Sequence, residues 1–99
     1  MLASTFDLDE VRRIVQDGLR GYPARVHLFG SWAEGSAGRA SDIDVAVLPL
    51  EPLPASLLSE IREALDESLV VYPVDLVDLS AATPQFRDRV AREGIPWNG

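Results

Sequence analysis

The feature that most constrains this chain is the run D-I-D-V-A-V-L-P at residues 42–49, which places two carboxylates at the start of an otherwise apolar segment. Alternate side chains of a β-strand share a face, so Asp42 and Asp44 point to one side while the apolar series that begins with Ile43 points to the other. Two carboxylates this close repel each other, and they either raise a pKa or recruit a cation. The run therefore predicts a buried strand that carries a charged site.

Helical and strand patterns alternate along the rest of the chain. Apolar residues at helical spacing predict helices, and short runs of β-formers bounded by glycine or proline predict strands. The predicted helices cover residues 7–20, 55–69 and 84–93, and the predicted strands cover residues 24–30, 42–49 and 73–79. Residues 31–40 are predicted to form a glycine-rich loop that opens with one helical turn. We expect a single domain over residues 1–99 with an α/β fold, in which helices flank a small mixed sheet of about three strands.

Composition argues against several classes of site and partner. The nine cations, all arginine, stand against 16 acids and give a net charge of −7, so we expect no direct DNA binding, which relies on clustered cations. Without cysteine, a metal must be bound by oxygen or by His27, and a half-buried strand residue is the expectation for that histidine. No apolar stretch approaches the length of a membrane span or a signal core, so a cytoplasmic protein without membrane contact is expected.

A phosphate-binding turn precedes the two acids. Gly30 allows the backbone to turn sharply at the end of the first strand, and Ser31 adds a hydroxyl beside main-chain N–H groups, an arrangement that favours phosphate. Mg²⁺ prefers hard oxygen ligands and is commonly held by one or two carboxylates together with substrate phosphates. The sequence therefore predicts Mg²⁺ between Asp42, Asp44 and a bound phosphate.

A third acid would complete a site for two metal ions, which can clamp the attacking and leaving oxygens of a phosphoryl displacement. The strand at residues 73–79 offers Asp75 and Asp78. These two residues have opposite parity, so only one of them can face the other acids if the strand is regular. Parity by itself leaves both choices open.

The spacing of these residues resembles a known signature. Gly30 and Ser31, then ten residues, then Asp42-Ile43-Asp44 is similar to the G-S-x10-D-x-D motif of the nucleotidyltransferase superfamily related to DNA polymerase β. The short length and the ending of the chain resemble the minimal nucleotidyltransferases of that superfamily, abbreviated MNT. The resemblance covers residues 25–97 and implies the palm-like nucleotidyltransferase fold.

The resemblance also implies an activity. Family members transfer the nucleoside monophosphate of an NTP, here expected to be AMP from ATP, to an acceptor hydroxyl and release pyrophosphate. By this likeness Asp42, Asp44 and Asp75 are the catalytic residues and the ligands of two Mg²⁺ ions. Gly30 and Ser31 would hold the triphosphate.

Partners follow from the same resemblance. Many MNT proteins are antitoxins that act on a HEPN-type toxin, an all-helical ribonuclease, by adenylylating one of its tyrosines or by binding it. We therefore expect a protein acceptor, since the chain has no room for a separate substrate domain. The alternatives are a binding module that occludes a HEPN toxin without catalysis, and transfer to a small molecule such as an aminoglycoside.

Two residues depart from the family pattern. Relatives often have arginine where this chain has Trp32 and Glu34. Neutralising the triphosphate would then fall to Mg²⁺, backbone amides and Arg39, with slower turnover or a partly degenerate nucleotide site as the consequence. Ser41 is predicted to act as a cap or to hydrogen-bond to Asp44, and it is counted among the expected nucleotide-binding residues with Gly30 and Ser31.

Overall fold

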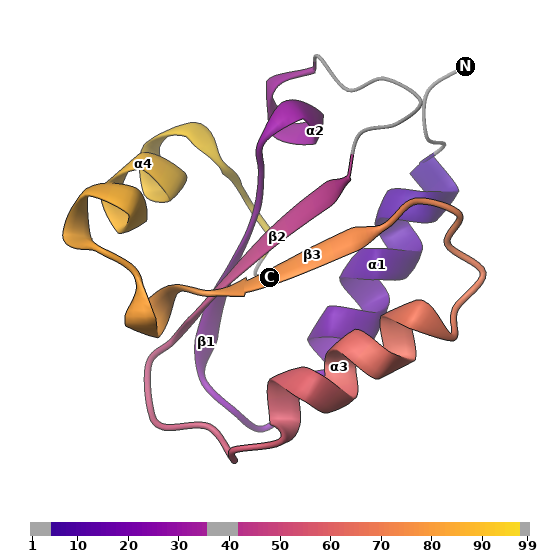
Figure 1. The fold of residues 1–99 in the computed structure, drawn as a ribbon, viewed down its shortest axis with the longest axis horizontal. Coiled ribbons are helices and arrows are strands. Elements are labelled where there is room, and N and C mark those ends of the chain that lie inside the picture. The colour runs from indigo at the N-terminus through magenta and orange to yellow at the C-terminus, as the bar shows by residue number, and fades with distance from the viewer. Residues whose placement is uncertain (1–4, 36–41, 98–99) are drawn as a thin grey trace.

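The computed structural model describes residues 5–35 and 42–97. These residues form one four-stranded sheet with helices on both faces (Figure 1). In chain order the elements are α1 (Thr5–Gly18), β1 (Ala24–Phe29), α2 (Ser31–Glu34), β2 (Ile43–Pro49), α3 (Leu57–Asp66), β3 (Val74–Asp78), the 3₁₀ turn η1 (Leu79–Ala81), α4 (Pro84–Glu93) and β4 (Ile95–Pro96). The α/β class and the mixed sheet are therefore confirmed.

The strands lie in the order β3-β2-β1-β4. β1 runs antiparallel to both β2 and β4, whereas β2 and β3 are parallel. The expectation of about three strands is low by one. The fourth strand, β4, has only two residues, which pair with His27 and Leu28, and a run this short shows no alternation that sequence patterns can detect.

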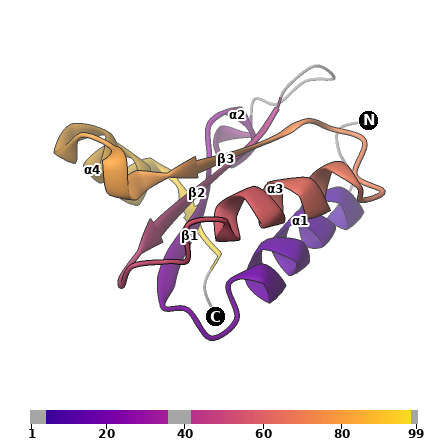
Figure 2. The same ribbon diagram turned by 60° about the horizontal axis from the view of Figure 1, so that its bottom comes forward.

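The main core lies between the sheet and the helix pair α1 and α3, which cover the same face (Figure 2). The predicted alternation in β2 is confirmed, because Ile43, Val45 and Val47 are all fully buried against this layer. The two helices approach closely at Gly18, where an added Cβ would lie 2.5 Å from a side-chain carbon of Ile61. Burial of this apolar surface is the main force that holds the layers together.

The other face of the sheet is covered by α4. Val90 of α4 and Ala46 of β2 are buried together, and the ring of Phe86 meets that of Phe29 edge to face with centroids 5.8 Å apart. The predicted bounds of α4 are confirmed, and the Thr83 hydroxyl accepts a hydrogen bond from the Phe86 amide as an N-cap. This smaller layer leaves part of the sheet face free for a site.

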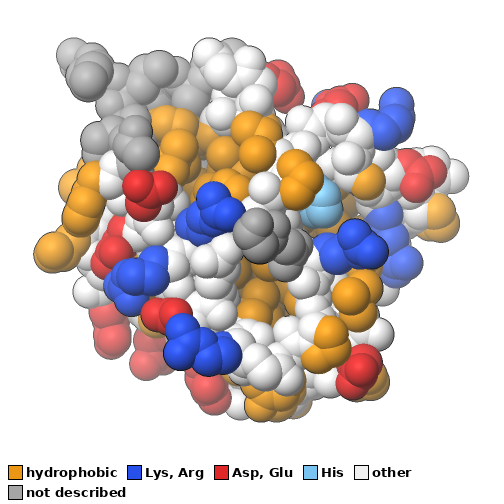
Figure 3. Space-filling view, turned by 180° about the vertical axis from the view of Figure 1, so that it is seen from behind, with side chains coloured by type: hydrophobic (Ala, Val, Ile, Leu, Met, Phe, Trp, Pro, Cys, Tyr) orange, Lys and Arg blue, Asp and Glu red, His pale blue; other side chains and the backbone are white. Residues whose placement is uncertain are grey.

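The helices and the surface charges relate to the expectations about membranes and DNA. No helix among the described residues is long and apolar enough to cross a membrane. Figure 3 shows the molecule from behind, where the arginine side chains stand at separate places instead of in one continuous basic stripe. The absence of direct DNA binding stays a prediction from the net charge.

Candidate active site

The centre of the site is a row of three side chains across the sheet. Asp44 of β2 is the register partner of Asp75 on the parallel strand β3 and of Phe29 on the antiparallel strand β1. Directly paired residues on neighbouring strands point to the same face. The row therefore places two carboxylates and an aromatic ring on the face that α4 partly covers.

Charge is concentrated in this row. Partial burial raises the pKa of Asp44, and the negative charges of Asp75 and Asp42 raise it further. Asp44 is half-buried, while Asp42 and Asp75 are exposed. The structure thus places Asp42 and Asp75 close enough to Asp44 for their charges to repel its carboxylate, and a cation would relieve that repulsion.

The turn at Gly30 fits against this charge. Gly30 has φ 74° and ψ −154°, a conformation open essentially to glycine alone, and an added Cβ would collide with the carboxylate of Asp44. Its carbonyl accepts the amides of Ala33 and Glu34, both at 3.1 Å. The predicted helical turn is therefore confirmed as α2, with Ser31 as its first residue, next to the acids. Ser41 and Arg39 lie outside the described residues.

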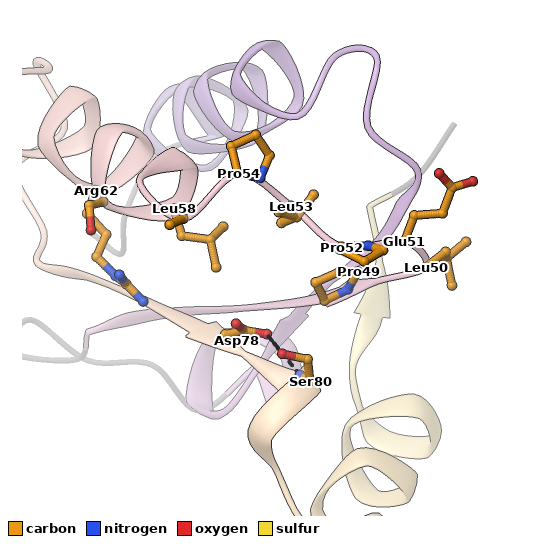
Figure 4. A pocket seen from close by; sticks show the side chains of 12 residues that line it. Pro49, Leu50, Glu51, Pro52, Leu53, Pro54, Leu58, Arg62, Asp78 and Ser80 are labelled. Atoms are coloured by element: carbon orange, nitrogen blue, oxygen red, sulfur yellow. Dashed lines mark hydrogen bonds between the residues drawn. The ribbon is translucent and has the colours of Figure 1, made fainter.

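Asp78 points away from this row. It pairs with Val47, three residues further along β2, or about 10 Å from Asp44 along the strand. Its carboxylate accepts hydrogen bonds from the amide (2.8 Å) and the hydroxyl (2.6 Å) of Ser80 and caps the turn η1. It borders a cavity of about 590 Å³ that Figure 4 shows, built from the loop after β2 together with Arg62 and Ser80. The register thus sets Asp75, and not Asp78, beside Asp44.

The comparison with known families agrees with this geometry. A family model described as polymerase beta, nucleotidyltransferase, matches residues 15–96. The match includes the Gly30–Ser31 turn and the acids of both strands. The chain belongs to this nucleotidyltransferase family.

Two curated relatives carry the same name. MntA of Haemophilus influenzae, described as a probable protein adenylyltransferase, is 33% identical over 86 residues, which cover 87% of this chain and 74% of MntA. MntA of Shewanella oneidensis, described as a protein adenylyltransferase, is 38% identical over 69 residues, which cover 70% of this chain and 49% of that protein. The nucleotidyltransferase described here thus matches about three quarters of the first relative and about half of the second.

Solved structures share the fold. A structure provisionally described as a minimal nucleotidyltransferase has a TM-score of 0.76 and 30% identity, with 96% of this chain and 97% of the other covered. A complex of a tri-AMPylated HEPN toxin of Shewanella oneidensis with an MNT antitoxin has a TM-score of 0.67 and 26% identity, with 95% of this chain and 71% of the other covered. The palm-like nucleotidyltransferase fold expected from the sequence is therefore confirmed.

The donor chemistry of the nucleotidyltransferase site suits a hard divalent cation. The three acids supply only oxygen, and Asp44 is destabilised as a carboxylate by partial burial and by its two acidic neighbours. Among residues 5–35 and 42–97, however, no three acidic or histidine side chains already form a group that could hold a metal ion. A cation at this site would need further ligands, such as water and substrate phosphate, which is the usual arrangement for Mg²⁺.

The residues that depart from the family pattern have distinct environments. Trp32 packs edge to face on Tyr72, with ring centroids 5.2 Å apart, and belongs to the edge of the main core. Glu34 is exposed and borders a small cavity next to Gly30. His27 is half-buried as expected, and its buried Nδ1 has no hydrogen-bond partner within residues 5–35 and 42–97. Neither aromatic packing nor an added acid replaces the positive charge that arginines would bring.

The small cavity next to Gly30 is lined in part by residues that the sequence did not indicate as site residues. It has a volume of about 170 Å³ and is bordered by Phe29, Gly30 and Glu34 together with Phe86 and Arg89 of α4. The sequence shows α4 as an amphipathic helix but gives no signal for where it docks. Only the return of α4 across the sheet brings these residues to the glycine turn.

Proposed function

We propose that this protein is a Mg²⁺-dependent adenylyltransferase that transfers AMP from ATP to a hydroxyl group of a partner protein. The observation that carries the proposal is the register pairing of Asp44 with Asp75 beside the Gly30 turn. We treat the 99 residues as one nucleotidyltransferase domain. The relatives described as protein adenylyltransferases support AMP as the group transferred.

Mg²⁺ would be held by Asp42, Asp44 and Asp75 together with water and phosphate oxygens. When bound, a pair of such ions neutralises the phosphates and the charge that develops on the attacking and leaving oxygens. The remaining work falls to groups of the chain. Gly30 and Ser31 bind the triphosphate at the start of α2, and we include Ser41 in this nucleotide site.

The reaction is a displacement at the α-phosphorus of ATP. The acceptor oxygen forms a bond to this phosphorus while the bond to the bridging oxygen breaks, and pyrophosphate leaves. The acceptor proton passes to a carboxylate, for which Asp75 is placed best because it is exposed at the β3 side of the row. Asp44, between Asp75 and the glycine turn, lies where acceptor and nucleotide meet.

The partner proposed is a HEPN-type toxin, which makes this protein an antitoxin. The similar fold found in complex with a tri-AMPylated HEPN toxin supports this choice. A tyrosine hydroxyl of the toxin is the proposed acceptor. Inhibition of the toxin would then result from the added nucleotide, and not merely from a stable complex.

The test uses ATP labelled at the α-phosphate, Mg²⁺ and the product of the neighbouring gene, which the proposal requires to be a HEPN-type toxin. Label should appear on a tyrosine of the toxin. Asp44→Asn and Asp75→Asn should each reduce the rate of labelling at least about 100-fold, because each removes a carboxylate from the reacting centre. Omission of Mg²⁺ should abolish labelling.

The matched control is Asp78→Asn, which changes the same residue type on the same strand but on the opposite face. It should keep labelling within about threefold of wild type, since Asp78 only caps the turn at Ser80. Toxin inhibition that survives Asp44→Asn without any label would contradict the proposal and support an occluding antitoxin. Label on an aminoglycoside but not on the toxin would support the small-molecule alternative.

A further inference from the structure

The cavity between α4 and the glycine turn, defined above by Phe29, Gly30, Glu34, Phe86 and Arg89, is built from mostly apolar groups. Two phenyl rings, the buried side chain of Val90 and the glycine backbone make up its apolar walls. Sites that enclose a whole drug-sized ligand occupy several hundred Å³. At about 170 Å³ this cavity suits a single ring system instead.

The chemistry of the walls favours a flat aromatic ring. Phe29 and Phe86 meet edge to face, with an angle of 82° between their planes, so they offer differently oriented aromatic surfaces to an occupant. Arg89 adds a guanidinium, which stacks on aromatic faces and is attracted by their π electrons. Nucleobases bind proteins through this combination of aromatic stacking and arginine contact.

Arg89 is free to make such a contact. Among the residues that the structure describes, its ion pair joins Nε to a carboxylate oxygen of Glu93, which also lines the cavity, at 3.3 Å, and both side chains are more than half exposed. An exposed pair of this kind contributes little to stability. A ring that enters the cavity therefore costs little when it draws the guanidinium away from Glu93.

The position of the cavity determines which ring enters. In the row Asp75, Asp44, Phe29 the cavity lies at the Phe29 end, on the side of the Gly30–Ser31 turn. The turn is where the triphosphate is proposed to bind, whereas the acceptor approaches at the exposed Asp75 end. A nucleotide held by its phosphates at the turn can therefore reach this cavity with its base, whereas an acceptor at the Asp75 end is further away.

We infer that this cavity is the binding site for the nucleobase of the donor nucleotide, with the ring held between Phe86 and the guanidinium of Arg89. The inference rests on the proposed function, because it extends the same nucleotide site. It assigns α4 a direct part in substrate binding. It also provides a cation near the nucleotide in a chain that lacks arginine at positions 32 and 34.

The experiment compares ATP with inorganic tripolyphosphate, which has the phosphates but no base, by isothermal titration calorimetry with Mg²⁺. Wild-type protein should bind ATP more tightly than tripolyphosphate. Phe86→Leu and Arg89→Gln should each weaken ATP binding about three- to tenfold, the effect of losing one stacking or cation–π contact. Binding of tripolyphosphate should stay within about twofold. Arg92→Gln, which removes an exposed arginine one turn along α4, is the matched control and should change neither affinity.

The outcomes distinguish failure of the proposed nucleotide site from failure of the base site alone. If wild-type protein binds neither ATP nor tripolyphosphate, the nucleotide site itself is wrong and the base site falls with it. If wild-type protein binds both and the variants lose both affinities equally, the cavity takes phosphate, and the inference is overturned. Unchanged affinities, or a raised KM for the protein acceptor with unchanged ATP binding, overturn it too. Arg89→Gln keeps the test valid if Phe86→Leu fails to fold, since Arg89 is exposed.

Discussion

At the scale of single residues, Gly30 joins the fold to the site. Its positive φ lets the chain leave β1 and enter α2 within one residue, and the missing side chain makes space for the carboxylate of Asp44. Gly35 also has a positive φ, but an added Cβ there would meet no atom of the described residues within 4 Å. Alanine substitutions at Gly30 and Gly35 therefore separate the cost of the backbone conformation from the cost of a contact with the Asp44 carboxylate.

Replacing Gly30 by alanine should lower the free energy of unfolding by about 2–4 kcal/mol, since it adds strain in a glycine-only conformation to a collision. Gly35→Ala, in an ordinary left-handed conformation, should cost about 1–2 kcal/mol. Urea denaturation measures both. In an Asp44→Ala background the cost of Gly30→Ala should fall by about 1 kcal/mol, because the clash is gone. Equal costs in both backgrounds would show that the contact with Asp44 is unimportant.

His27 gives the fold a dependence on pH. Burial lowers the pKa of this histidine, and the charge of Arg25 lowers it further. The unfolded chain therefore binds the proton more readily than the folded one. The contribution of neutral His27 to the free energy of unfolding is fully present above the ordinary histidine pKa of about 6.5, and it is lost as the pH falls through the lowered pKa of the folded state.

The expected result is that His27→Leu gains stability relative to wild type only on the acid side. The difference in unfolding free energy between the two proteins should be constant above about pH 7 and should shift in favour of the variant as the pH falls below about 6.5. Denaturant titrations from pH 7.5 to 5.5 measure this, and no other histidine of the chain titrates in that range. A difference that does not vary with pH would contradict the prediction.

At the scale of elements, α4 matters most because it carries one wall of the proposed base site. Its start is held by the Thr83 cap, and Arg87 donates hydrogen bonds to the carbonyls of Leu79 (2.8 Å) and Ser80 (2.7 Å). Val90 then anchors the helix in the smaller core. The placement of Phe86 thus depends on local capping as well as on packing.

Thr83→Ala should lower the free energy of unfolding by about 1 kcal/mol, because the Phe86 amide loses its side-chain acceptor. For a domain of this size that corresponds to a fall in Tm of about 4–8 °C, measurable by circular dichroism. Thr83→Ser retains the hydroxyl and should stay within about 0.5 kcal/mol of wild type. If the serine variant loses as much stability as the alanine variant, the cap is not the cause.

At the scale of the whole molecule, local patterns predicted more of the fold than of the site. The strands of residues 43–49 and 74–78 and the bounds of α4 agree with the sequence because alternation, capping and glycine stops act within a few residues. α1 begins two residues earlier than predicted. The pairing of β4 with β1 was not predicted, because it depends on a contact between segments nearly 70 residues apart.

The amino-acid pattern alone shows that a glycine–serine turn precedes two acids on one face of a buried strand, and this spacing was sufficient to indicate the family. The strand pattern left Asp75 and Asp78 open and the family resemblance selected Asp75, whereas the register of the folded sheet shows Asp75 beside Asp44. The position of Phe86 and Arg89 beside Gly30 is visible in the folded structure alone. The physical reason is that side-chain alternation is a property of each strand alone. Register and helix docking arise from packing between distant segments, where a shift of one residue would turn the other acid toward the site.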